Sequence, residues 1–174
     1  SMVLGHSQTG FIDKIDGPYY FFKALQKLRE SWPRSIPLVG IEGGYINVVP
    51  VDFVVDALVH LSHQPKLDGR CFHLTDPKAR RVGEVLNVFA RAAHAPEMAF
   101  RLDSKIFDMV PEPVTQSVQR SKPIQNVFNQ LLRDLQVPRS VLQFVNYPTR
   151  FDSTATQKIL DKAKIRVPAL EDYA

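Results

Sequence analysis

The stretch YINVVPVDFVVDALVHL, residues 45–61, joins two hydrophobic patterns without a break. Its first seven residues are mostly β-branched or apolar, which is typical of a β-strand. Asp52 follows, and its short acceptor side chain can satisfy the free amides of a helix that we expect over residues 53–63. The buried stripe expected for that helix consists of Val54, Leu58 and Leu61. A strand that runs directly into an amphipathic helix is a building unit of α/β proteins.

The alternation of strand and helix extends on both sides of this stretch. Apolar runs predict further strands in SMVLGH (1–6), PLVG (37–40), RCFHLTD (70–76) and FRL (100–102). Helices are expected after Pro18, over residues 82–93 and from about Ser153, where Asp152 or Ser153 is the expected cap. We therefore predict an α/β portion over residues 1–103. Residues 104–174, with amphipathic segments such as IQNVFNQLLRDL, are predicted to form a mainly helical C-terminal part.

The composition is that of an ordinary globular protein, with 174 residues, a net charge of +4 and a single cysteine. No apolar run approaches the roughly 20 residues of a membrane-spanning helix, and no signal-peptide pattern is present. The single cysteine excludes an internal disulfide, so we expect a cytoplasmic protein. The basic residues are scattered apart from KARR at 78–81, so we expect no nucleic-acid partner.

Several motifs that would carry chemistry are absent. The sequence contains no G-x-G-x-x-G and no phosphate-binding loop, and His6, Ser7 and Asp13 lack the G-x-S-x-G elbow of a hydrolase. The helical spacing of Asp56, His60 and His63 is compatible with a metal site, but a solvated polar face is the expected alternative, and we assign no metal. Cys71 lies beside Phe72 in an expected strand and is interpreted as a small core residue.

The segment DGPYYFFKALQKLR, residues 16–29, places Tyr19 and Lys23 four residues apart at the start of a helix. A lysine one turn away can lower the pKa of a tyrosine, which is the arrangement of a proton-donating pair. However, Pro18 precedes the pair and aromatic residues fill the interval. The favoured interpretation is a helix start that packs aromatic side chains against the core, and a wall that lines an apolar pocket is the remaining alternative.

Four segments together resemble extended short-chain dehydrogenase/reductases. They are SMVLGHSQTG-FIDKIDGPYYFF, INVVPVDFVVDALVHL, GRCFHLTDPKARRVGEVLNVFARAA and YPTRFDSTATQKIL with RVPALEDYA. In order and spacing they resemble the strands, helices and tail that follow the catalytic Tyr-x-x-x-Lys helix of that family. The resemblance covers nearly the whole chain and is closest to the bacterial thioester-reductase or fatty-acyl-CoA-reductase branch.

This resemblance implies the C-terminal, substrate-binding portion of a Rossmann-type reductase. The nucleotide-binding half, the catalytic Ser/Thr and the Tyr-x-x-x-Lys helix of the family would precede residue 1. The implied activity is NAD(P)H-dependent reduction of fatty acyl thioesters or related apolar carbonyls. The full-length family uses NADP(H), and we expect no stable cofactor binding and no turnover from this chain alone. We therefore assign no catalytic residue.

The resemblance also implies site residues. Gly5, His6 and Ser7 would lie near the cofactor. The implied substrate-binding residues are Gln8, Thr9, Asp16, Gly17, Tyr19 and Tyr20. The expected partners are an apolar acyl substrate, the nucleotide-binding half and a second copy in a homodimer. The alternative function is a stand-alone, non-catalytic module that holds an apolar ligand or pairs with another chain.

Overall fold

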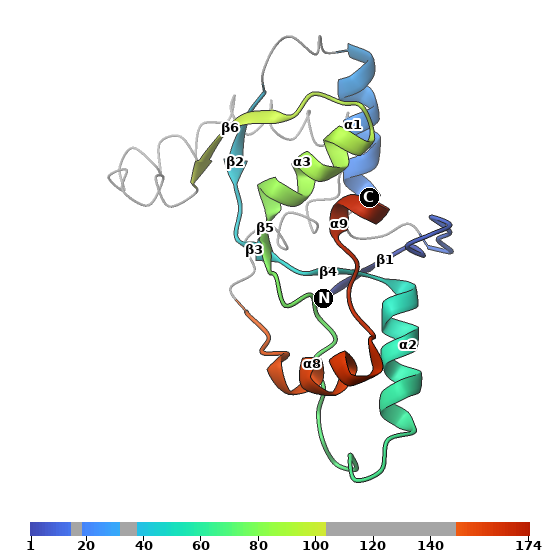
Figure 1. Ribbon diagram of the computed structural model, residues 1–174. Coiled ribbons are helices and arrows are strands. Elements are labelled where there is room, and N and C mark those ends of the chain that lie inside the picture. The colour runs from blue at the N-terminus through green and yellow to red at the C-terminus, as the bar shows by residue number, and fades with distance from the viewer. Residues whose placement is uncertain (15–18, 32–37, 104–148) are drawn as a thin grey trace.

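The computed structural model describes residues 1–14, 19–31, 38–103 and 149–174 (Figure 1). These residues form a mixed α/β structure, which agrees with the predicted α/β class. The strands are β1 Met2–Leu4, β2 Leu38–Glu42, β3 Tyr45–Ile46, β4 Val48–Pro50, β5 Arg80–Arg81 and β6 Met98–Asp103. The helices are α1 Tyr20–Ser31, α2 Val51–Ser62, α3 Val82–Ala92, α8 Thr154–Leu160 and α9 Leu170–Tyr173, with a 3₁₀ turn η3 at Asp161–Ala163.

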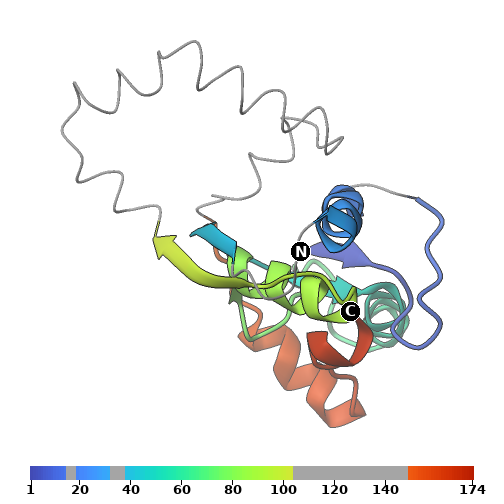
Figure 2. The same ribbon diagram turned by 90° about the horizontal axis from the view of Figure 1, so that it is seen from above.

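The strands of the described residues pair two by two. β1 lies parallel to β4, with Val3 opposite Val49, and β2 lies parallel to β6 with an irregularity between Leu38 and Val39. β3 and β5 are antiparallel. The helices α1 and α8 lie at opposite ends of the molecule, with strands between them (Figure 1, Figure 2). No helix among the residues described here is both long and apolar enough to cross a membrane.

The stretch 45–61 forms a strand region followed by a helix, as predicted, but its details differ. Asn47 separates β3 from β4, which pair with different strands. The helix begins at Val51, and its N-cap is Pro50 rather than the expected Asp52. The predicted stripe was also wrong in part, because the buried residues of α2 are Phe53, Ala57 and Leu61.

Residues 70–76 form no strand, which corrects the prediction for RCFHLTD. The side chain of Asn47 binds both the backbone amide and the backbone carbonyl of Asp76. Its Nδ2 donates to the Asp76 carbonyl oxygen at 2.7 Å, and its Oδ1 accepts from the Asp76 amide at 2.9 Å. With no ladder to direct alternate side chains inward, Cys71 is exposed, so its assignment to the core was wrong.

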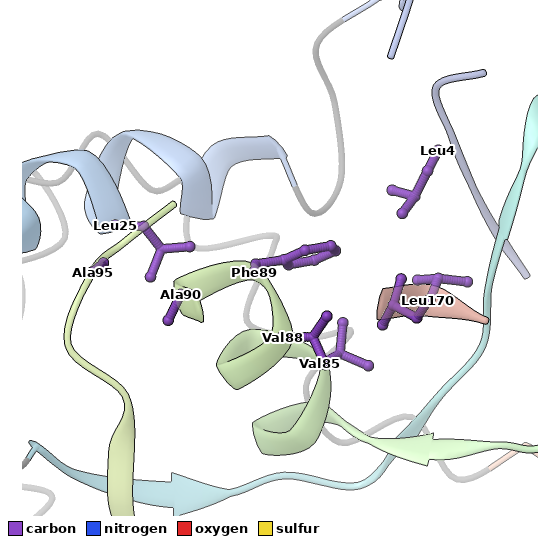
Figure 3. Packing of buried hydrophobic residues seen from close by; sticks show 9 residues of the cluster. Leu4, Leu25, Val85, Val88, Phe89, Ala90, Ala95 and Leu170 are labelled. Carbon is purple, nitrogen blue, oxygen red and sulfur yellow. The ribbon is translucent and has the colours of Figure 1, made fainter. Parts of the chain in front are cut away.

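Among the described residues, two hydrophobic clusters form the core. The first joins Leu4 and Val48 of the β1–β4 pair to α1, α3 and α9, and its members include Leu25, Val85, Val88, Phe89 and Leu170 (Figure 3). The second joins Val49 to α2 and α8 through Phe53, Ala57, Leu61 and Leu160. Because Val48 and Val49 point to opposite faces of their strand, the β1–β4 pair lies between the two clusters.

The C-terminal segment belongs to both clusters. Leu160 of α8 is fully buried and Leu170 of α9 is 1% exposed. Arg80 forms a bidentate ion pair with Glu171, which holds α9 near the start of α3. The predicted helix near residue 153 is confirmed as α8, and Asp152 Oδ1 accepts hydrogen bonds from the amide and hydroxyl of Thr154. The helices expected within residues 104–148 lie outside the described residues, and the division at residue 103 stays a prediction.

Candidate functional site

The loop after β1 makes a tight turn that requires glycine. A Cβ on Gly5 would lie 2.8 Å from the carbonyl oxygen of Phe11, which is closer than side chains approach backbone atoms. The turn is closed by the His6 amide, which donates to the Phe11 carbonyl at 3.0 Å, and by the Gly10 amide, which donates to the His6 carbonyl at 2.8 Å. Gly10 adopts φ +67°, a conformation that glycine tolerates without strain.

Tyr19 fixes the beginning of this loop. The Gly5 amide donates to the Tyr19 Oη at 2.6 Å. The Tyr19 ring packs edge to face on Phe22, which packs in the same way on Phe89 of the core, each at 5.0 Å between centroids. Lys23, which lies four residues after Tyr19 as in a proton-donating pair, is exposed. The geometry therefore fits the interpretation of an aromatic helix start that packs against the core.

Ser7 and Asp52 connect the loop to the start of α2. The Ser7 amide donates to Asp52 Oδ1 at 2.8 Å, and the Ser7 hydroxyl donates to Oδ2 at 2.6 Å. Partial desolvation raises the pKa of Asp52, but the hydrogen bonds from Ser7 favour the carboxylate and bring the pKa below its ordinary value. Asp52 therefore anchors the loop from within the first turn of α2, two residues after the Pro50 N-cap.

The strand directions explain why these groups meet. β1 and β4 are parallel, so their carboxyl ends lie side by side. The loop that follows Leu4 and the helix that follows Pro50 therefore start from the same end of the pair. Ligands of open α/β sheets bind outside the carboxyl ends of strands. The loop thus lies at the carboxyl ends of the strands, where such proteins bind ligands.

His6 and Ser7 offer one donor and one acceptor to a ligand. The Gln8 amide donates to His6 Nδ1 at 3.2 Å, so a neutral His6 ring carries its proton on Nε2 as a free donor position. The proton of the Ser7 hydroxyl is committed to Asp52, which leaves the Ser7 oxygen as an acceptor. A carbonyl oxygen could accept from the imidazole, while a hydroxyl or amide could donate to the serine.

The predicted site residues are placed as follows. Gly5, His6 and Ser7 are half-buried in the loop, and Gln8 and Thr9 are exposed at its tip. Half-buried Tyr19 and Tyr20 lie at the start of α1. Asp16 and Gly17 lie outside the described residues. The structure brings Gly5 into contact with Tyr19, and the cofactor and substrate roles of all these residues stay predictions.

A cavity of about 750 Å³ lies at the opposite ends of the same strands. Met2 at the start of β1 and Asn47, just before β4, line it, together with Tyr45 of β3 and residues of the segment that enters α8. Its size is that of pockets that hold drug-sized ligands. This cavity is not predictable from local sequence patterns, because its walls come from segments about 100 residues apart.

Tyr45 forms an aromatic wall of this cavity, and the guanidinium groups of two arginines lie near its ring. The Arg150 guanidinium carbon lies 4.0 Å from the ring centroid, and that of Arg81 lies 5.8 Å from it. Guanidinium groups at such distances are attracted to the face of the ring. Phe151 contributes a second ring to the lining and contacts His73, with 5.2 Å between centroids.

Two groups missed from sequence have recognisable signals in retrospect. Asp52 follows a parallel strand by two residues, a position at which an acidic side chain reaches the loop of the neighbouring strand. Arg150 lies three residues before the predicted start of α8 at Ser153 and next to an aromatic residue, Phe151. Neither signal names the partner, because both contacts are distant in sequence.

The structure does not assemble a metal site from the helical triplet. Within the described ranges no three His, Cys, Asp or Glu side chains gather closely enough to hold a metal ion. His63 instead places its Nδ1 2.8 Å from the carbonyl oxygen of Val59, within its own helix.

Comparison with known proteins yields a likeness of fold. No family model matches the sequence, and no curated protein matches it. A solved structure does match, described as the terminal R domain from the myxalamid PKS-NRPS biosynthetic pathway. The match has a TM-score of 0.57 and 23% sequence identity, and covers 99% of this chain and 41% of that chain. The chain therefore has the fold of part of that R domain and spans about two fifths of its length.

Proposed function

We propose that this chain is the substrate-binding portion of an NAD(P)H-dependent oxidoreductase that reduces fatty acyl thioesters or related apolar carbonyls. The observation that carries the proposal is the loop 5–10 at the carboxyl edge of two parallel strands, held there by Tyr19 and Asp52. The likeness of fold to a terminal R domain, and the resemblance of the sequence to Rossmann-type short-chain reductases of the acyl-reducing branch, support it.

The loop suits an acyl thioester in two respects. The His6 Nε2–H can donate a hydrogen bond to the thioester carbonyl oxygen, which gains negative charge when hydride arrives. The half-buried aromatic rings that open α1 offer apolar surface to an acyl chain. NADP(H), when bound by a nucleotide-binding half, would supply the hydride, and this chain would position the carbonyl.

The test separates binding from turnover. Calorimetric titration with palmitoyl-CoA and with free CoA should show tighter binding of the acyl form. His6→Ala should weaken palmitoyl-CoA binding about fivefold, the effect of one lost hydrogen bond near 1 kcal/mol. Gln64→Ala, an exposed neutral change after α2, is the matched control and should bind as the wild type does.

Two results would contradict the proposal. Equal binding of CoA and palmitoyl-CoA would remove the acyl specificity. Steady oxidation of NADPH by the purified chain with palmitoyl-CoA would show that the chain does not need a nucleotide-binding half.

A second candidate function is a non-catalytic module that holds an apolar ligand. The cavity of about 750 Å³ beside Tyr45 favours it, because this chain provides the lining by itself. The same titration distinguishes the two sites. Under the module hypothesis Tyr45→Ala weakens palmitoyl-CoA binding and His6→Ala does not, whereas the reductase hypothesis predicts the reverse.

A further inference from the structure

A smaller cavity of about 310 Å³ lies at the C-terminal end of α2. It is lined by His60 in the last turn of α2, by Arg70 in the segment that follows the helix, and by Lys162 of η3. These elements meet at the end of the molecule opposite α1 (Figure 1). Because α2 has 12 residues and is about 18 Å long, the cavity is well separated from the loop 5–10 at the other end of the helix. Its volume is near the lower limit, about 300 Å³, of pockets that hold small molecules.

The core fixes the apolar floor of this cavity. Leu67 and Ile159 line it, and both are half-buried against the second core cluster. Ile159 is followed directly by Leu160, which is fully buried in the same cluster. Since the core holds the backbone on both sides, the cavity is a preformed part of the fold.

The charge at the cavity is of one sign. Among the described residues, three basic side chains and no acidic one line it. His60 is half-buried, whereas Arg70 and Lys162 are exposed, and none of the three forms an ion pair with a carboxylate in the described part of the chain. Asp161, the neighbour of Lys162 in sequence, contacts Arg166 instead, with 3.0 Å between Oδ1 and Nε. The cavity therefore has two full positive charges and an imidazole that can donate a hydrogen bond.

Arg70 is held in place without a carboxylate. Arg80, Arg91 and Arg166 each bind an acidic side chain. The guanidinium carbon of Arg70 instead lies 5.3 Å from the ring centroid of Phe72, an attraction that restrains the side chain. The N–H groups at the edge of the guanidinium remain available to a ligand, and a restrained side chain loses less conformational entropy on binding.

We propose that this cavity binds a small organic phosphate monoester. The phosphate oxygens accept hydrogen bonds from Arg70, Lys162 and His60, and the organic group lies on Leu67 and Ile159. The site is separate from the loop 5–10, so the proposal goes beyond the proposed function and does not depend on it.

The balance of charge favours this class of ligand. A phosphate monoester carries nearly two negative charges at neutral pH, which match the permanent charges of Arg70 and Lys162, whereas a carboxylate carries one. The C-terminal end of α2 repels an anion with the equivalent of only about half a charge. The two full positive charges outweigh that repulsion.

Calorimetric titration with phenyl phosphate at neutral pH and low salt tests the site. We expect one equivalent to bind, and Arg70→Ala and Lys162→Ala each to weaken binding about fivefold, the effect of one exposed ion pair. Arg91→Ala removes the same charge from α3, outside the cavity, and should bind as the wild type does. Phenol, which lacks the phosphate, and benzoate, which has one negative charge, should each bind at least about fivefold more weakly than phenyl phosphate.

Two controls separate this site from folding and from the proposed reductase site. Arg70 and Lys162 are exposed, so their alanine variants should keep the circular dichroism and melting temperature of the wild type. His6→Ala changes the loop at the other end of α2 and should leave phenyl phosphate binding unchanged. A chain that binds phenyl phosphate through Arg70 but does not bind palmitoyl-CoA would support this site while the proposed function fails.

Three outcomes overturn the inference. The first is a wild-type chain that does not bind phenyl phosphate. The second is binding that Arg70→Ala and Lys162→Ala leave unchanged, or that Arg91→Ala weakens to the same extent. The third is binding of phenol as tight as that of phenyl phosphate, which would make the cavity a site for an uncharged ligand.

Discussion

Replacing Gly83 by alanine tests whether a buried carboxylate holds the start of α3. Gly83 lies in the first turn of α3, and its amide donates to Glu42 Oε1 at 2.8 Å. Glu42 is only 6% exposed and also contacts Arg101, with 3.2 Å between Nη1 and Oε2. A Cβ on residue 83 would lie 2.6 Å from Glu42 Oε1 and 2.9 Å from Arg101 Cδ. The carboxylate must therefore move away from the helix if alanine is introduced.

Two opposing effects decide the sign of the change. Alanine is favoured over glycine in a helix by about 1 kcal/mol. Displacing Glu42 removes a hydrogen bond to a charged group, which is worth roughly 1.5–3 kcal/mol, and withdraws negative charge from the positive end of the helix dipole. The loss is larger, so we expect Gly83→Ala to reduce the free energy of unfolding by about 1 kcal/mol. For a chain of this size that corresponds to a melting temperature lower by about 2–4 °C.

The double variant makes the reasoning refutable. In a Glu42→Ala background the carboxylate is gone and the Arg101 side chain, released from its ion pair with Glu42, can move its Cδ away from residue 83. Gly83→Ala should then stabilise the protein by up to about 1 kcal/mol, the helix preference alone. Urea denaturation of the wild type, both single variants and the double variant gives the four free energies of unfolding. If Gly83→Ala stabilises the protein while Glu42 is present, the carboxylate does not constrain the helix start.

Three further predictions concern the loop and the core. A double-mutant cycle of Ser7→Ala and Asp52→Ala in urea should give a coupling of about 1 kcal/mol. The folded-state pKa of Asp52 lies below its ordinary 3.8. The coupling energy should therefore be complete above pH 3.8 and should vanish as the pH falls through the lower folded-state pKa. A coupling energy that persists in acid would contradict the Ser7–Asp52 interaction as its source. Tyr19→Phe removes the acceptor of the Gly5 amide and should lower the free energy of unfolding in urea by about 1–2 kcal/mol. An unchanged free energy of unfolding would mean that water replaces the Tyr19 hydroxyl as acceptor without cost. Leu160→Ala, at a fully buried position, should lower the free energy of unfolding by about 2–5 kcal/mol; a loss below 1 kcal/mol would remove α8 from the core.

Local patterns predicted much of the fold. The helices over residues 51–62 and 82–92 follow from their periodicity, and the strand before the first of them follows from its β-branched composition. The segment 70–76 has the same strand-like composition but no partner strand, since the side chain of Asn47 binds the Asp76 peptide instead. Composition cannot distinguish these two cases, because a strand exists only when a second segment satisfies its backbone.

The candidate site was predictable as a loop but not as a set of contacts. Gly5 and Gly10 mark a turn after a strand, and the structure places a turn there. The partners of Gly5 and Ser7 lie 14 and 45 residues away, and nothing in the local pattern indicates the Tyr19 or Asp52 contact. The cavity beside Tyr45 was missed for the same reason, since Arg150 reaches it from a segment 105 positions later in the chain.

Local sequence patterns were enough to predict the helices α1, α2, α3 and α8, because hydrophobic spacing is a local property of the backbone. Only the tertiary structure decided which face of α2 is buried. The helix offers two apolar faces with the same spacing, and the inner one is defined by Val49 and by Leu160, which lies about 100 residues further along the chain. The tertiary structure also turned Asp52 from an expected helix cap into the anchor of a loop, because parallel strands bring their distant carboxyl ends to one edge.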